Sequence, residues 1–205
     1  MYAAAVAILA GISEHRMHPA FHLALVTGLR RGELLGLRWD HVDIDLGQVA
    51  VVQQLAVERG APVITELKTE SSHCVVPIRR ATVKMLEDHR AAQSAEATIA
   101  GGARENSGLV FTTTLGGLTD PNNFSRLMRE LISNTGVPAI TPKGLRHTAR
   151  SVGRVVVGDD KVMQERLGHS DVEITLGTYT HVVDEQHRRA GELIDEMFAT
   201  ASTPT

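Results

Sequence analysis

The chain has 205 residues, a length that allows one large domain with a substantial buried core. Hydrophobic residues make up 42% and charged residues 22%, as in ordinary globular proteins, and aromatic residues only 3%, so the core must be largely aliphatic. The formal net charge of −3 argues against a protein that coats nucleic acid through bulk positive charge, but it leaves room for a local basic site.

Cysteine usage and hydropathy limit the kinds of site and the cellular compartment that the chain can have. The single cysteine, Cys74, excludes an intrachain disulfide and a four-thiolate zinc site, and it favours a reducing cytoplasm. The apolar residues 1–12 lack a preceding basic region and lead into a helical pattern, so we interpret them as a core helix. No stretch reaches the ~18 apolar residues of a membrane span. His18 and His22 have a spacing found in helical metal sites, but core histidines are commoner, and we assign no metal.

The first predicted elements are helical. We expect a helix over residues 2–11 and a helical stretch over residues 18–37. The segment "TGLRRGE" interrupts this stretch, so that one helix ends at Thr27 or Gly28 and the next begins near Arg31. The segment "WDHVDIDLG" is interpreted as a turn.

The middle of the chain predicts a small sheet. Residues 48–78 are rich in Val and Ile with period-two stretches, and turn signals at "ERGAP" and "TESS" indicate a three-stranded antiparallel sheet. After the sheet we expect a helix over residues 80–98, then a Gly-rich loop, "AGGARENSG", and then a short strand and turn, "LVFTTTLGGLT". Residues 199–205 are expected to be a disordered tail. The fold class is therefore mostly α with a small three-stranded antiparallel sheet (α+β), with helices over residues 80–98, about 120–134, 142–157, 159–167 and 184–198.

Several basic residues lie where they could bind an anion. Arg30 is at a helix junction in an apolar run, and Lys143 and Arg146 share one face at a helix start. Helix starts favour anions because free N–H groups point outward there, and guanidinium groups match phosphate oxygens. Taken singly, each has an ordinary explanation: Arg30 could pair with Glu33, and Lys68 could lie at a hairpin tip.

Four sequence boxes occur in a fixed order: "TGLRRGELLGLRW", "LKTESSHCVVPI", "KGLRHT" and "LGHSDVEITLGTYTHV". Alone, His169 could cap a helix and Tyr179 could be a half-buried aromatic residue. Together, the boxes resemble the catalytic domain of the tyrosine recombinases, the phage-integrase-like site-specific recombinases, over about residues 18–198. The resemblance implies a tyrosine recombinase catalytic-domain fold over residues 1–198.

The resemblance implies a role for each matching residue in cleaving and rejoining DNA. Arg30 and Arg146 would hold the non-bridging phosphate oxygens and neutralise charge in the transition state. Tyr179 would attack phosphorus and form a covalent 3′-phosphotyrosine. Lys68 would protonate the departing 5′-oxygen, and His169 would hydrogen-bond a phosphate oxygen. Neither a metal ion nor a nucleotide cofactor would be required.

One position departs from the family's commonest pattern, which has a histidine where this chain has Lys143. An imidazole could accept the proton of Tyr179, whereas a protonated lysine cannot. We predict that Lys143 is a third electrostatic clamp that lowers the tyrosine pKa, unless burial among cations makes it neutral. The neighbouring His147 lies about 100° away on the helix and is a poor substitute. Glu33 matches an acidic residue that the family uses to orient its site.

The resemblance also implies partners in the cytoplasm of a bacterial or phage-infected cell. They are a double-stranded DNA attachment site, further copies of the chain in a tetramer on DNA, and accessory DNA-bending or directionality proteins, with no membrane partner. The free chain would be a monomer. Two alternatives stay open: strand relaxation like that of type IB topoisomerases, and a non-enzymatic DNA-binding relic of the fold. Arg31 and Arg150 are expected to bind DNA within a basic face that also includes Arg30, Arg38, Lys68, Arg79, Arg80, Lys143, Arg146 and Arg154.

The two ends of the chain raise separate expectations. The family commonly has an N-terminal core-binding domain, but only about 15 residues precede the matching region here. We therefore expect that domain to be absent from this chain, either because the chain is a fragment or because it is naturally truncated. The last helix carries an apolar stripe that could pack on its own core or dock into a neighbouring subunit, formed by Leu193, Ile194, Met197 and Phe198.

Overall fold

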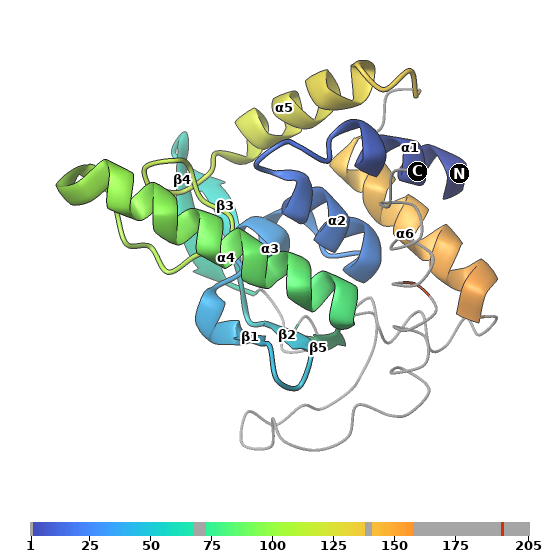
Figure 1. Ribbon diagram of the computed structural model, residues 1–205, viewed down its shortest axis with the longest axis horizontal. Coiled ribbons are helices and arrows are strands. Elements are labelled where there is room, and N and C mark those ends of the chain that lie inside the picture. Colours follow the sequence, from blue (N-terminus) through green and yellow to red (C-terminus); the bar gives the residue numbers. More distant parts are fainter. Residues whose placement is uncertain (1, 68–72, 138–140, 158–193, 195–205) are drawn as a thin grey trace.

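The computed structural model describes residues 2–67, 73–137, 141–157 and 194 (Figure 1). The helices are α1 (Tyr2–Gly11), α2 (His18–Thr27), α3 (Arg31–Leu35), α4 (Arg80–Ala100), α5 (Pro121–Ser133) and α6 (Pro142–Val157). The strands are β1 (Val42–Asp43), β2 (Gln48–Val51), β3 (Gln53–Glu58), β4 (Ala61–Glu66) and β5 (Cys74–Pro77), and short 3-10 helices are η1 (Trp39–His41) and η3 (Gly101–Ala103). The predicted helix over 159–167, most of the one over 184–198 and the tail over 199–205 lie outside the described residues.

Helix α2 lies at the centre of the helical part of the molecule. It contacts α1, α3, α4 and α6, and every one of its residues from 20 to 27 is buried. In Figure 1, α4 crosses one side of α2, α6 lies on the other, and α5 lies above. A helix that is apolar on all sides is typical of such a central position. None of the described helices combines the length and the apolar character needed to cross a membrane.

The core is mainly aliphatic, as the composition predicts. Helix α1 contributes Ala5, Ile8 and Leu9, each no more than 1% exposed, so the apolar start of the chain is a core helix. One aromatic pair lies where two helices meet: the rings of Phe21 and Phe124 stack with centroids 5.2 Å apart. This contact packs α2 against α5.

The extended region forms two small antiparallel sheets. Strands β1, β2 and β5 make a three-stranded sheet, in which Val49 pairs with both Val42 and Val76. Strands β3 and β4 form a separate hairpin, with Leu55 opposite Ile64. Residues 48–78 thus hold four strands, and the third strand of the sheet comes from β1, in the segment interpreted as a turn. Residues 48–58 contain no turn signal, but pairing partners change at Val52, and a period-two pattern alone does not identify partners.

The predicted turn at "ERGAP" connects β3 to β4. Its two central residues, Arg59 and Gly60, have positive φ angles of 50° and 84°. Two successive left-handed residues are typical of the tight turns that match the twist of an antiparallel hairpin. The hairpin packs against α3 and α5, so it lies beside the helix that begins next to Arg30.

Two buried polar residues of α4 hold the segment over residues 109–112, where a short strand was predicted. The carbonyl of Val110 accepts hydrogen bonds from His89 Nε2 at 2.8 Å and Gln93 Nε2 at 3.3 Å. Gln93 Nε2 also donates to the carbonyl of Leu109, and its Oε1 accepts from Trp39 Nε1 at 2.8 Å. The segment pairs through isolated antiparallel bridges, Leu109 with Arg38 and Thr112 with Leu118, and side chains of α4 satisfy these buried carbonyls.

Candidate active site

The sequence "TGLR", residues 27–30, forms a sharp turn between α2 and α3. The Thr27 hydroxyl donates to the carbonyl of Leu23 at 2.5 Å, which closes the last turn of α2. Gly28 has a φ of 68°, a left-handed conformation that glycine adopts without a steric penalty, and its N–H donates to the carbonyl of Ala24. The reversal places Arg30 at the start of α3.

Arg30 is held by a buried carboxylate one helical turn away. Glu33 Oε2 accepts the backbone N–H of Arg30 at 2.7 Å, and Oε1 accepts Arg30 Nη1 at 2.5 Å. The Glu33 side chain is 5% exposed and the Arg30 side chain 42% exposed. Nε and Nη2 of Arg30 hydrogen-bond no residue that the structure describes. One nitrogen of the guanidinium is therefore held by a buried carboxylate, and donors remain for an anion.

Arg146 meets the same turn from a distant part of the sequence. Its Nη1 donates to the carbonyl of Gly28 at 2.5 Å, across 118 residues of chain. It lies in α6, which begins as its sequence predicts: Pro142 occupies the first position, and the Thr141 hydroxyl accepts the N–H of Gly144 at 3.1 Å. The turn over residues 27–30 thus brings Arg146 beside the segment that carries Arg30.

Cys74 on β5 borders the same group of charges. Burial, and to a smaller degree the Glu33 carboxylate, raise the pKa of its thiol to about 12, although the Arg146 and Arg30 guanidinium groups oppose the shift. Since the thiolate is the nucleophilic form of cysteine, this thiol is inert near neutral pH. Sequence reasoning did not place Cys74 at the site; its only signal was its position in the box "LKTESSHCVVPI".

The other predicted site residues fall into two groups. Lys143 is exposed on the first turn of α6, three residues before Arg146, and Arg150 lies further along the same helix. Lys68, His169 and Tyr179 lie outside the described residues. The structure therefore describes the two arginines, Glu33 and Lys143, and leaves the nucleophile and both remaining predicted side chains as predictions.

Arg31, which was predicted to bind DNA, contacts the interior of the protein. Its Nη1 donates to the Ser125 hydroxyl at 2.6 Å and to the carbonyl of Pro121 at 3.0 Å. Both acceptors belong to the first turns of α5. One of its nitrogens is therefore used to join α3 to α5.

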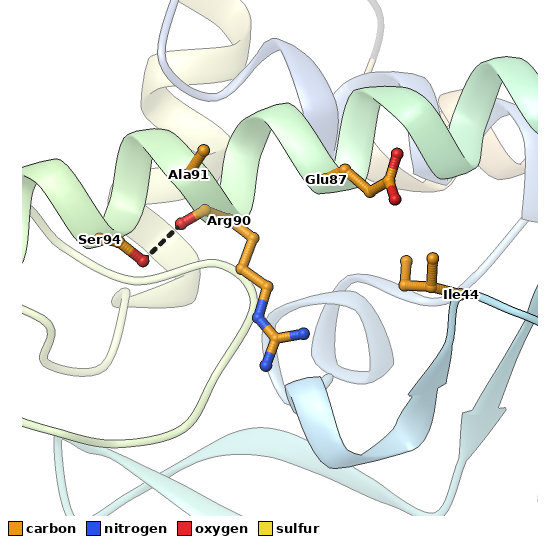
Figure 2. A pocket seen from close by; sticks show the side chains of 5 residues that line it. All are labelled: Ile44, Glu87, Arg90, Ala91 and Ser94. Atoms are coloured by element: carbon orange, nitrogen blue, oxygen red, sulfur yellow. Dashed lines mark hydrogen bonds between the residues drawn. The ribbon is translucent and has the colours of Figure 1, made fainter.

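An open hollow on the outer side of α4 is separate from this site. Figure 2 shows Arg90 extending from α4 beside it. The Arg90 guanidinium lies 5.2 Å from the centre of the Trp39 ring, a cation–π contact. The hollow has a volume of about 410 Å³ and is lined by Ile44, Glu87, Arg90, Ala91 and Ser94. None of these is a predicted site residue.

Of the two histidines on α2, His22 is buried and His18 is partly exposed. His22 is 4% exposed, and its Nε2 hydrogen-bonds the Thr82 hydroxyl at 3.1 Å. The rings of His18 and His22 lie 6.1 Å apart. In the part of the chain that the structure describes, no three or more His, Cys, Asp or Glu side chains group as metal ligands do.

One residue of the last apolar stripe is described. Ile194 is 2% exposed and belongs to the core of this chain. At this position, the packing agrees with the alternative in which the last helix packs on its own chain and does not dock into a neighbouring subunit.

The fold is similar to solved structures of DNA recombinases. It matches the Tn1549 transposon integrase in complex with transposon right end DNA with a TM-score of 0.68 and 21% identity, over 90% of this chain and 62% of that one. It matches the crystal structure of XerA recombinase with a TM-score of 0.65 and 22% identity, over 98% of this chain and 64% of that one. The fold is that of a tyrosine recombinase catalytic domain.

Sequence comparison identifies the family. A model described as "Phage integrase family" matches residues 4–186, so the chain belongs to the phage integrase family. It is 33% identical over 196 residues to a "Tyrosine recombinase XerC-like" protein of Caldanaerobacter subterraneus subsp. tengcongensis, covering 90% of this chain and 50% of the relative. It is 30% identical over 213 residues to an "Integrase" of Streptomyces ambofaciens, covering 96% and 52%. The chain thus spans about half the length of these curated relatives.

Proposed function

We propose that this chain is the catalytic part of a site-specific recombinase that cleaves and rejoins double-stranded DNA through a 3′-phosphotyrosine at Tyr179. The observation that carries the proposal is the meeting of Arg30 and Arg146 around one turn. Arg30 leads out of that turn, and Arg146 binds its glycine carbonyl. Membership of the phage integrase family supports the same chemistry.

Two guanidinium groups held beside one turn suit a phosphodiester, which repels nucleophiles because it is anionic. Arg30, held at one nitrogen by Glu33, keeps donors for a non-bridging oxygen, and Arg146 supplies a second positive charge beside it. Charge that develops on phosphorus oxygens during displacement is stabilised by such preorganised donors. The carboxylate of Glu33 holds Arg30 and does not contact the substrate.

The remaining roles belong to residues matched by sequence. Tyr179 Oη loses its proton to water and attacks phosphorus, and Lys68 protonates the departing 5′-oxygen. The phosphorus–oxygen bond to that strand breaks as the tyrosine ester forms. His169 donates a hydrogen bond to a phosphate oxygen. A 5′-hydroxyl of a partner strand then attacks the ester and releases the tyrosine, which conserves the bond without a cofactor.

The test is covalent capture on nicked suicide duplexes that carry candidate sites from DNA flanking the gene. The wild-type chain should form a protein–DNA adduct on a denaturing gel, and Tyr179→Phe should form none. Arg146→Ala should slow adduct formation by a factor of about 100 or more, because it removes one transition-state donor. An adduct that persists in Tyr179→Phe would refute the assignment of the nucleophile.

The same assay separates the alternatives. Binding without an adduct on every candidate site would favour the non-enzymatic relic. Relaxation of supercoiled plasmid without strand exchange would favour the topoisomerase-like activity. We expect DNA binding by this chain to be weak and to fall steeply with salt, because the chain is acidic overall and phosphate contacts must come from local basic residues.

Lys143 is proposed as a third electrostatic clamp at the first turn of α6. Its place three residues before Arg146 puts both cations on one helical face. A pH–rate profile of Lys143→His tests its role, because an imidazole can accept a proton near neutral pH. An unchanged acid limb would show that position 143 does not set the rate.

On DNA we propose a tetramer of otherwise monomeric chains, with accessory DNA-bending or directionality proteins. Sedimentation of the chain with and without a candidate site measures the first part. Four protein copies per pair of sites is the expected result, and one copy per site at every concentration would refute the tetramer.

A further inference from the structure

We propose that Arg31 is a positioning residue for the cleavage step: it ties α3 to α5 and thereby fixes Arg30. This inference rests on the proposed function, because it concerns the rate of that reaction. It differs from the expectation that Arg31 contacts DNA. The two roles predict different effects for a serine that Arg31 touches, and that serine makes the proposal testable.

Helix α3 requires support from outside. It has five residues, and isolated helices of such length are not stable in water because nucleation costs more than a few hydrogen bonds return. Its position therefore depends on tertiary contacts. Arg30 immediately precedes it and takes its backbone position from it.

The contact with α5 is made by one nitrogen of Arg31. Nη1 donates to the Ser125 hydroxyl at 2.6 Å and the Pro121 carbonyl at 3.0 Å, and the same hydroxyl donates to that carbonyl at 2.9 Å. The acceptors are themselves well held. The Asp120 carboxylate caps α5 by accepting the N–H groups of the second and third helical residues, both at 2.8 Å.

The other side of α3 lies directly on the backbone of β3. A Cβ at Gly32 would lie 2.8 Å from the Leu55 carbonyl oxygen, and a Cβ at Gly36 would lie 2.8 Å from the backbone of Gln54. The Gly36 carbonyl accepts Gln53 Nε2 at 2.7 Å. Helix α3 therefore packs between β3 and α5, and Arg31 makes hydrogen bonds on the α5 side.

Loss of the Arg31 contact would free one side of α3 while β3 continues to hold the other. The helix could then rotate against β3, and the guanidinium of Arg30 would move relative to Arg146. A displacement of about 1 Å in a catalytic group is enough to slow a reaction by about 100-fold. Binding of DNA, which is spread over many phosphate contacts, would change little.

The experiment compares Arg31→Ala, Ser125→Ala and Ser125→Thr with Arg126→Ala in the 205-residue chain. Arg126 is a matched control on α5, because its side chain donates to Asn123 Oδ1 of the same helix. For each variant we would measure the adduct-forming rate at saturating suicide substrate, the Kd for intact duplex at several salt concentrations, and the unfolding midpoint.

Positioning predicts a rate that falls about 10-fold or more in Arg31→Ala and several-fold in Ser125→Ala, with Kd within about twofold of wild type. Ser125→Thr should restore the rate, because it returns the hydroxyl. The double alanine variant should be no slower than Arg31→Ala, since both remove one interaction. Arg126→Ala should keep the wild-type rate.

The inference would be overturned if Ser125→Ala kept the wild-type rate while Arg31→Ala showed a weaker Kd and a salt slope smaller by about one. That combination would assign Arg31 to phosphate binding. That result would leave the proposed function standing, because the wild type would still form its adduct. No adduct with the wild-type chain would overturn the proposed function, and the inference with it.

Discussion

The stability of this chain should fall in mild acid because of His22. The side chain is 4% exposed, and its Nε2 is hydrogen-bonded to the Thr82 hydroxyl. Burial, and to a smaller degree the nearby His18, lower the pKa of His22 from 6.5 to about 4. The folded protein therefore keeps this imidazole neutral over a range in which the unfolded chain binds a proton.

The sign and size of the effect follow from these two pKa values. A histidine with a depressed pKa contributes its full stability above pH 6.5, and that contribution is lost as the pH falls from 6.5 toward 4. At pH 5 the loss amounts to about 2 kcal/mol, since each pKa unit corresponds to about 1.4 kcal/mol and the upper one and a half units have been crossed. Burial also lowers the pKa of His18 and His89, so the whole chain should lose more.

Urea unfolding at pH 7.5 and pH 5.0 measures the effect, and His22→Gln isolates it. Glutamine can place an amide near the Thr82 hydroxyl but does not titrate. The drop in unfolding free energy between the two pH values should be smaller in His22→Gln than in the wild type by about 2 kcal/mol. Equal drops in the two proteins would refute the reasoning.

Three further predictions concern the site and its supports. Glu33→Gln removes the charged acceptor of two Arg30 N–H groups. The free energy of unfolding in urea should fall by about 1–2 kcal/mol, and cleavage of the suicide substrate should slow. An unchanged cleavage rate would mean that Glu33 does not position Arg30 for the reaction. Arg16→Ala removes a bidentate ion pair with Glu96 and a hydrogen bond to the carbonyl of Thr112. The free energy of unfolding, measured by thermal melts, should fall by about 1–2 kcal/mol, and a fall of less than about 0.5 kcal/mol would contradict this prediction. Gly32→Ala should cost about 1–3 kcal/mol by clashing with β3, while Gly102→Ala, with open space around its Cβ, should stay near wild type in the same melts.

Local signals in the sequence predicted the elements that depend on local chemistry. The break after α2 follows from Gly28, the hairpin turn from "RG", and the predicted bounds of α6, residues 142–157, agree with the structure because proline and a capping threonine mark its start. The boxes also placed Arg30 and Arg146 in one site, and the structure shows them around one turn.

Contacts between distant segments could not be predicted in the same way. The change of partner at Val52 depends on which strands meet β2 and β3, and alternation of side chains carries no information about partners. The contact of Arg31 with Ser125 joins residues 94 apart. From the sequence alone, an arginine next to the proposed catalytic Arg30 was expected to contact DNA. The place of Cys74 beside the charged groups depends on how β5 pairs with β2.

The contact of α3 with β3 has a mechanical consequence. Where side chains separate two elements, changes of rotamer can absorb a small shift of either one. At Gly32 and Gly36 the backbone of the helix meets the backbone of the strand, with no side chain between them. The hairpin and the start of α3 should therefore move together. A displacement of the hairpin should then also displace Arg30, which immediately precedes α3.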